Sequence, residues 1–419
     1  MSPSTLQIIA VTIFTLAIIH IFSVKYFEHL AHRSEKHSGL FHLLGEIEVV
    51  FGIWAMILVL FMFIFLGKEE TMNYVNNRNY VETMFVFVIM VIAATRPILN
   101  TVLSLVKRVS NILPLKGATS FYFVVMCLVP LLGSLITEPA AMTLAALILS
   151  DKLFSQGISN KLKYITLGTL FINISVGGTL TNFAAPPILM VAKTWEWDTI
   201  FMFTTFGWKA IIITFINTIL IIVLFYKELS NINIRTTVSD REKIPFTIVF
   251  VHFIFLFLVV YFGHYPAFFM SIFLLFLGVT YAYQQYQDRL MLREGLLVAF
   301  FLGGLVILGG QQEWWLKDII SNMSNVEAFV GAITLGAFTD NAAITYLGSL
   351  VQGLSDEFKY FLVAGAVCGG GLTIIANAPN PAGAAILKSH FDDNSIDPRY
   401  LFLGALLPTL IASMCFIIL

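Results

Sequence analysis

Long apolar stretches, each about the length of a membrane-crossing helix, alternate along this chain with short polar segments. The uninterrupted apolar stretches lie at 6–24, 43–66, 82–105, 205–226, 246–262, 267–283, 294–309 and 400–419. A helix of about 20 apolar residues crosses the roughly 30 Å hydrocarbon core of a bilayer. Because backbone polar groups must be satisfied internally in lipid, the pattern predicts an all-α integral membrane protein.

Four further apolar segments are interrupted by small polar motifs and form two pairs. Segments 119–152 and 326–353 hold about 30 residues each, which is more than one straight helix needs to cross a bilayer. We predict that each is a re-entrant helical hairpin. Segments 164–192 and 360–388 have centres rich in Gly, Pro and Asn, and we predict broken transmembrane helices whose unwound backbone lines a cavity or is buried in protein.

The two hairpins carry matching four-residue motifs. The two broken helices each carry three polar residues in a corresponding region. The hairpin motifs are Thr137, Glu138, Pro139 and Ala140 in the first and Thr339, Asp340, Asn341 and Ala342 in the second. The polar residues of the broken helices are Thr179, Thr181 and Asn182 in the first and Thr373, Asn377 and Asn380 in the second. The sequence thus predicts two copies of one unit, with an acid at the equivalent point of each hairpin tip.

Positive charge predicts the direction of the spans, because cytoplasmic loops carry an excess of Lys and Arg. If both segments are hairpins and both termini lie outside, the inner loops hold 17 Lys and Arg residues and the outer loops hold 5. If both are full spans, the tally becomes 10 against 12. The hairpin model therefore predicts about 10 full spans plus 2 hairpins, arranged as inverted-topology repeats.

The corresponding organisation has four parts. These are two N-terminal helices (1–81), a first repeat (82–226), linker helices (227–293) and a second repeat (294–419). Each repeat contains one hairpin followed by one broken helix, so the two hairpin tips are expected to meet near the middle of the membrane.

A carboxylate in the middle of a membrane is either protonated or paired with a cation. Such a group is by default a marker of an ion or substrate path, so we identify Glu138 and Asp340 as the cation- and proton-binding acids. Oxygen atoms of Thr137, Thr339 and Asn341, with those of the broken helices, could complete the shell of a hard cation. The alternative is that each acid only caps the second arm of its hairpin.

Three other charged residues lie in apolar surroundings: Glu46, Glu48 and Arg96. An ion pair between Arg96 and one of the two glutamates would lower the cost of burying both charges. A structural ion pair is the simpler interpretation, and a proton relay is the alternative.

Composition narrows the class of protein. The chain is 58% hydrophobic and 12% charged, and its net charge of −1 gives no indication of nucleic-acid binding. Its three cysteines lack metal-ligand spacing. Protease and hydrolase motifs are missing from the sequence. We therefore expect neither an enzyme nor a cofactor or transition metal, and expect the lipid bilayer, sodium and protons as partners.

At these motifs the chain resembles the ion-transporter superfamily, which includes arsenite pumps and sodium-coupled dicarboxylate carriers. Within it the chain is most similar to the family described as putative bacterial sodium/proton antiporters, over roughly 82–226 and 294–419. The resemblance implies ion sites at hairpin tips and broken helices, a scaffold with a mobile transport unit, and a homodimer in the cell inner membrane. Residues 339–341 fit the Asp-Asn tip of related members, whereas residues 137–139 depart from it.

The leading functional hypothesis is exchange of a monovalent cation, with sodium expected, for protons. The alternative is a sodium-coupled symporter of a small anion such as a dicarboxylate. Two carboxylates at the tips would repel a dianion, which favours antiport. The sequence names neither the ion nor the stoichiometry.

Overall fold

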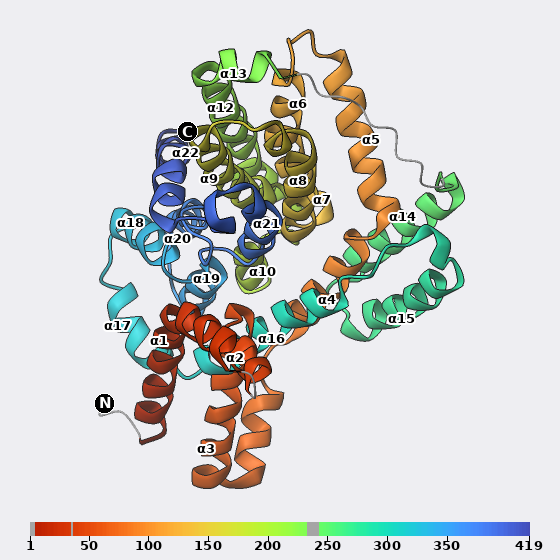
Figure 1. Ribbon diagram of the computed structural model, residues 1–419. Coiled ribbons are helices and arrows are strands. Elements are labelled where there is room, and N and C mark those ends of the chain that lie inside the picture. Colours follow the sequence, from red (N-terminus) through yellow and green to blue (C-terminus); the bar gives the residue numbers. More distant parts are fainter. Residues whose placement is uncertain (1–4, 35–36, 233–242) are drawn as a thin grey trace.

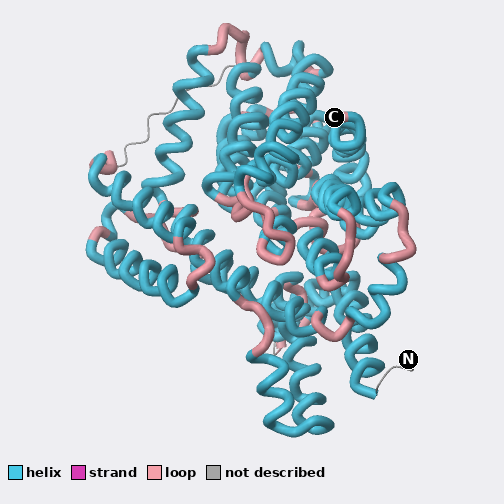
Figure 2. The backbone as a smooth tube through the Cα atoms, turned by 180° about the vertical axis from the view of Figure 1, so that it is seen from behind, coloured by secondary structure: helices cyan, strands magenta, loops and turns pink. Residues whose placement is uncertain are grey.

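The computed structural model describes residues 5–34, 37–232 and 243–419. Its described secondary structure is helical throughout, and no strand occurs in these ranges (Figure 2). This agrees with the all-α class predicted from the apolar pattern. Of the predicted linker, 233–242 lies outside the described residues.

Three N-terminal helices precede the predicted repeats: α1 (Thr5–Arg33), α2 (Ser38–Leu44) and α3 (Ile47–Asn76). They lie at one end of the molecule in Figure 1. Gly67 interrupts α3 with a φ of 80°, a value that glycine adopts without a steric penalty. α3 packs along α16 (Leu292–Gly309), where Gly304 allows the backbones to approach closely.

The segment predicted as one plain span at 82–105 is instead two helices, α4 (Val81–Ala93) and α5 (Arg96–Ile112), bent by 64°. The prediction of an uninterrupted span was wrong there because the helix breaks at Ala94 and Thr95, just before Pro97, whose ring would clash with the carbonyl of Ala93 in a continuous helix. Ile98, Val102 and Val106 are buried on one face of α5, while other residues of the helix are exposed. A helix with one polar face is typical of a membrane interface rather than of the bilayer centre.

The first hairpin unit comprises two packed arms and an interrupted helix. Its arms are α6 (Thr119–Phe123), η1 (Val124–Leu128) and α7 (Val129–Ile136), which run on continuously, and α8 (Glu138–Lys152). The short η2 (Phe154–Gln156) follows, and the interrupted helix is α9 (Asn160–Gly177), η3 (Gly178–Leu180) and α10 (Pro186–Ala192). The chain leaves through α11 (Thr199–Met202), η4 (Phe203–Gly207) and α12 (Trp208–Leu224).

The connecting region brings the chain to a second hairpin unit of the same order. It consists of α13 (Tyr226–Ser230), α14 (Phe246–Tyr261), α15 (Pro266–Ala282), η5 (Gln284–Tyr286), α16 and α17 (Glu313–Ile320). The second unit has the arms α18 (Asn325–Gly336) and α19 (Asn341–Ser349) and the interrupted helix α20 (Asp356–Gly369) and α21 (Asn380–Leu387). The chain ends with η6 (Lys388–His390), η7 (Asp392–Asn394) and α22 (Pro398–Ile418).

The short helix of each unit packs against a hairpin arm of the other unit. α10, from the first unit, packs on α19 of the second, and α21 packs on α8 of the first. Gly383 makes the latter contact close, since a Cβ there would lie 2.5 Å from Sδ of Met142. Each hairpin tip is therefore enclosed by both units.

Five of the described helices are long and apolar enough to cross a membrane by themselves, and the bent α4–α5 pair brings the number to six. The five are Val49–Asn76, Thr119–Ile136, Thr199–Leu224, Leu292–Gly309 and Pro398–Ile418. Shorter apolar helices include α14, α15 and α18. The architecture is that of a membrane protein, and the number of full crossings stays a prediction.

Candidate functional site

The first hairpin turns at Thr137, and Glu138 begins the second arm. Thr137 has a φ of 73°, a left-handed value that costs energy in a β-branched residue and that requires surrounding contacts to hold it. Glu138 is completely buried. The tip therefore fixes a carboxyl group inside the protein at the N-terminus of α8, where the helix dipole favours negative charge.

The Glu138 side chain receives one hydrogen bond, from the other unit. Nδ2 of Asn377 donates to Oε2 across 2.8 Å. Among the described residues Oε1 has no hydrogen-bond partner. It lies against Gly178, where a Cβ would come within 2.3 Å of it. A buried carboxyl with no cationic side chain bonded to it must hold a proton or an added cation.

Asp340 terminates the turn of the second hairpin. It is 5% exposed, and its Oδ1 accepts from the backbone N–H of Ala342 across 2.8 Å, which caps α19. Asp340 and Asn377 line one cavity of about 10 Å³, and Asn377 is also the hydrogen-bond partner of Glu138. Asn377 thus connects the two acids.

The site gathers oxygen atoms that could bind a hard cation. Buried oxygens without a hydrogen-bond partner among the described residues belong to Thr137 (Oγ1), Glu138 (Oε1), Asn341 (Oδ1), Asn377 (Oδ1) and Asn380 (Oδ1). Buried acceptors are normally satisfied, and carboxylate, amide and hydroxyl oxygens suit hard cations. The donor set therefore fits sodium-like chemistry, and the described residues contain no cluster of His, Cys, Asp and Glu suited to a transition metal.

The two units make the same backbone contact between hairpin tip and interrupted helix. The N–H of Glu138 lies 3.4 Å from the carbonyl oxygen of Ala184, and the N–H of Asn341 donates to the carbonyl of Ala376 across 3.0 Å. In each case the first residue of the second hairpin arm bonds to the unwound segment, so Glu138 corresponds to Asn341.

A pair of threonines repeats in the same way. Thr181 donates from Oγ1 to the carbonyl of Ser134 across 2.7 Å, and Thr373 donates to the carbonyl of Ala337 across 2.7 Å. Each carbonyl lies four residues before the corresponding tip residue, Glu138 or Asn341.

Two glycines complete the correspondence. Gly178 and Gly370 each follow the long half of an interrupted helix. A Cβ on Gly178 would contact Glu138, and a Cβ on Gly370 would lie 2.5 Å from Nδ2 of Asn341. Each glycine thus provides space for the polar side chain at the start of the facing hairpin arm.

These three pairs of contacts correct the sequence alignment by one residue. Asp340 precedes Asn341 and corresponds to Thr137, so the two acids occupy neighbouring positions of the repeat rather than equivalent ones. In the sequence, the single acid in each hairpin motif had favoured aligning Glu138 with Asp340. The two carboxyl groups consequently have different surroundings: Asp340 caps a helix, whereas Glu138 follows the cap position.

The other predicted residues divide into two groups. Asn341 is fully buried with Nδ2 3.5 Å from Oγ of Ser175, and Asn380 donates to the carbonyls of Gly370 (2.8 Å) and Thr373 (2.9 Å). These two asparagines lie beside the tip of the second hairpin. The Asn380 side chain keeps carbonyls of the unwound backbone hydrogen-bonded, as a break inside a membrane requires.

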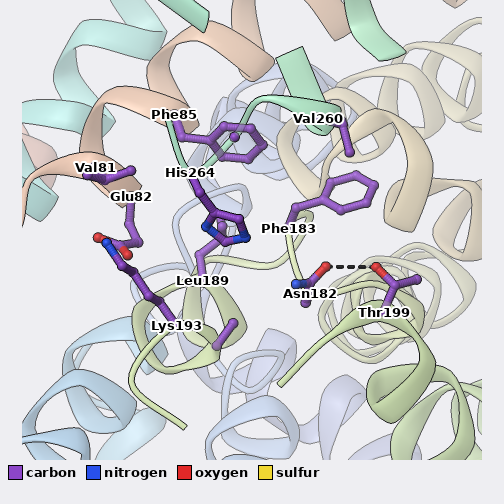
Figure 3. Close-up of a pocket in the computed structure, with 12 residues that line it drawn as sticks. Val81, Glu82, Phe85, Asn182, Phe183, Leu189, Lys193, Thr199, Val260 and His264 are labelled. Atoms are coloured by element: carbon purple, nitrogen blue, oxygen red, sulfur yellow. Dashed lines mark hydrogen bonds between the residues drawn. The ribbon is translucent and has the colours of Figure 1, made fainter. Parts of the chain in front are cut away.

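The hydroxyls of the remaining threonines bond locally, and Asn182 lies elsewhere. Thr179 donates to the carbonyl of Val176 (2.7 Å) and Thr339 to that of Leu335 (2.8 Å). Asn182 bonds to Trp197 and Thr199 at the rim of a separate pocket (Figure 3). Thr179 and Thr339 thus bond to carbonyls near the ends of their own helices, and Asn182 bonds at the rim of the separate pocket.

An ion pair of Arg96 with Glu46 or Glu48 was expected, and Glu46 is not its partner. Glu46 pairs with Arg293 at the start of α16, and Arg96 donates to the backbone carbonyl of Gln285 across 3.3 Å. The bend after α4 places Arg96 at the first turn of α5, where it reaches the connecting region. The side chain of Glu48 lies outside the described residues.

Sequence analysis missed a buried amide network beside the first unit. Asn173 donates to the carbonyl of Met126 (2.8 Å), and Asn217 donates to Oδ1 of Asn173 (3.0 Å). Ser134 and Ser175 are also buried next to the site. The sequence did contain a signal: Asn, Ser and Thr lie within otherwise apolar spans. Such polar side chains are costly to bury unless they find hydrogen-bond partners.

Comparison with known proteins gives one family. A family model described as "Putative Na+/H+ antiporter" matches residues 5–419, nearly the whole chain. The search of curated proteins found no match. The match extends through the N-terminal and linker helices, beyond the range over which the motifs alone carried the resemblance.

Proposed function

The chain belongs to this antiporter family, and we propose that it exchanges sodium for protons across the cell inner membrane, with both termini outside. The observation that carries the proposal is the environment of Glu138. This carboxyl group is fully buried and receives one hydrogen bond, from Asn377, which lines a small cavity together with Asp340.

Competition for one site explains how such a group could exchange two ions. A buried carboxylate is stable when it binds a proton or when it coordinates a cation, and losing one ion favours taking the other. The unpartnered oxygens of Asn341 and Asn377 would supply neutral ligands. Asp340 adds a second negative charge, which a cation or a proton can balance.

The two units support a proposed inverted-repeat architecture. They make the same three contacts and pack their short helices on each other's hairpins, and the charge bias of the loops predicts that their hairpins enter from opposite sides of the membrane. We propose that this pairing forms a transport unit, with α1–α5 and α14–α17 as its surroundings. A homodimer remains an expectation of the resemblance.

The small-anion symporter has no support. Two acids at the tips would oppose a dianion, and the family match describes an antiporter.

Proton flux in proteoliposomes tests the proposal. Purified protein is reconstituted with a pH-sensitive dye inside, and sodium, lithium, potassium or a dicarboxylate is added outside. Sodium-driven proton movement is expected from the wild type, and none from Glu138→Gln or Asp340→Asn.

Both substitutions retain the local structure, so loss of flux reports the charge. Gln at 138 can still accept from Asn377, and Asn at 340 keeps an oxygen for the cap on Ala342. The exposed acid Glu313 provides the matched control, and Glu313→Gln should exchange normally. Normal exchange by both neutral site variants would refute the carboxylate mechanism.

A further inference from the structure

Two cavities lie beside the breaks in the interrupted helices, one in each unit, and a larger cavity of about 830 Å³ lies away from the breaks, at the start of α9. The α10 pocket, of about 160 Å³, is lined by α4, α10 and the end of α14 and includes Phe183 and Leu189 (Figure 3). The α21 cavity, of about 10 Å³, is lined by α16, α21 and the second hairpin tip and includes Ile375 and Pro381. Their volumes differ by more than tenfold.

The two cavities occupy corresponding places in the two units. Phe183 immediately precedes Ala184, whose carbonyl contacts the first hairpin tip, and Ile375 immediately precedes Ala376, whose carbonyl contacts the second. Leu189 and Pro381 follow these residues at the same spacing. In each unit, moreover, the second helix before the hairpin contributes a wall: α4 to the α10 pocket and α16 to the α21 cavity.

Each cavity adjoins one of the two acids. The α10 pocket is separated from Glu138 by the short stretch from Asn182 to Ala184, with Phe183 on the pocket side. The α21 cavity contains Asp340 and Asn377, the partner of Glu138. Each cavity is thus lined by the residue that precedes the backbone contact with a hairpin tip, Phe183 in the α10 pocket and Ile375 in the α21 cavity.

Charged side chains surround the wider cavity. Glu82, at the start of α4, and Lys193, at the end of α10, point toward one another in Figure 3, and His264 lies beside them. All three adjoin loops that the charge bias predicts to lie outside. The α21 cavity instead lies between α21, which leads to the predicted cytoplasmic segment 388–399, and α16, which starts from another cytoplasmic segment.

We propose that the α10 pocket and the α21 cavity are the outer and inner ends of one ion path to Glu138 and Asp340. The path is for a monovalent cation and protons, and this inference rests on the proposed exchange function. Phe183 closes the inner end of the α10 pocket, and Ile375 is its counterpart on the cytoplasmic side. Neither acid lines the α10 pocket and Glu138 is fully buried, so the structure is an occluded state in which the outer end of the path is the wider one.

Sided labelling of paired cysteines tests this. Phe183→Cys and Ile375→Cys are made separately in a background in which Cys127, Cys368 and Cys415 are replaced by Ala, and a membrane-impermeant maleimide is applied to right-side-out and inside-out vesicles. Leu189→Cys and Ala378→Cys provide a second pair, one from each cavity. Size-exclusion profiles identify any variant that misfolds.

Phe183→Cys and Leu189→Cys should react from outside only, and Ile375→Cys and Ala378→Cys from inside only. We call Ile375→Cys and Ala378→Cys the inner pair and Phe183→Cys and Leu189→Cys the outer pair. If the inward-facing state is a minor population, the inner pair reacts at least about tenfold more slowly than the outer pair. Reaction of both pairs from the same side would overturn the two-ended path. Faster reaction of the inner pair would overturn the assignment of the outer end as the wider one.

Labelling is independent of exchange, so failure of this inference can be distinguished from failure of the proposed function. The Asp340→Asn background should retain the same sidedness while losing sodium-driven proton flux. If the sidedness is as expected but the wild type moves no protons with sodium, the path stands and the antiport proposal fails. If sodium exchange is normal but the sidedness is wrong, the path fails alone.

Discussion

Asn377 donates from its side-chain amide to Oε2 of Glu138 across 2.8 Å, although 239 positions separate the two residues in the sequence. The contact joins the unwound segment of the second unit to the hairpin tip of the first. It also places Asn377 between Glu138 and Asp340, since Asn377 and Asp340 line the same small cavity. One amide is thus in a position to respond to the charge of both acids.

Asn377→Ala should weaken cation binding. A hydrogen bond to a charged group contributes about 1.5–3 kcal/mol, so losing the donor to the ionised Glu138 should lower the apparent cation affinity by about tenfold or more. Isothermal titration with sodium at a fixed alkaline pH measures this. Asn322→Ala, which removes an exposed amide, is the control, and equal affinities in the two variants would refute the assigned role.

Gly178→Ala should abolish exchange without unfolding the protein. Its Cβ would lie 2.3 Å from Oε1 of Glu138 and must displace the carboxyl group. Gly370→Ala should act similarly through Asn341, whose Nδ2 would lie 2.5 Å from the added atom. Proteoliposome flux and thermal unfolding, measured together, separate loss of function from loss of structure.

Gly278 provides the matched control for these glycine variants. It lies within α15, and no atom of the described neighbours lies within 4 Å of the position that a Cβ would occupy there. Alanine is a better helix former than glycine, so Gly278→Ala should retain full exchange. Full exchange by Gly178→Ala as well would mean that the position of Glu138 is not critical.

Cation affinity should fall as the pH is lowered. If Glu138 and Asp340 bind either protons or the cation, the two ligands compete, and each reduces the affinity for the other by the same factor. Calorimetry in several buffers of different ionisation enthalpy, between about pH 6 and pH 9, reports both the affinity and the protons released. An affinity that is constant with pH, with no proton release, would exclude competition at these acids.

The stability of the segment that follows α21 should depend on pH through His390. Burial, together with the positive charge of Lys163, lowers the pKa of His390 below its ordinary value of 6.5. Its Nε2 lies 2.7 Å from Oγ of Ser150. The unfolded chain binds more protons in the interval below 6.5, so stability is greatest above that pH and falls as the pH decreases through the folded pKa.

Thermal unfolding in detergent from about pH 7.5 to about pH 5 measures this dependence. His390→Gln, which keeps a hydrogen-bonding side chain at the position, should flatten the decrease below pH 6.5. An identical decrease in the variant and the wild type would assign the effect to other groups.

The order of residues along the chain was enough to identify the membrane class, the two acid-bearing segments, the two interrupted helices and the family resemblance. These are local properties: apolar runs of spanning length, and Gly, Pro, Asn and acidic residues inside them. The positions of Glu138, Asp340 and Asn377 in such motifs could therefore be recognised without a structure. The sequence could not align the two hairpin tips to the residue, because a single acid in each motif invites matching Glu138 with Asp340.

Which residues meet became known only from the packing of the folded chain. Backbone contacts show that Glu138 corresponds to Asn341, the packing of α21 on α8 brings Asn377 to Glu138, and the packing of α3 on α16 brings Glu46 to Arg293. The physical reason is that burial of apolar surface is non-directional, so an apolar pattern specifies that a helix is buried but not against which partner. Hydrogen bonds and close glycine contacts are directional and short, and they fix the register only once distant segments have packed together.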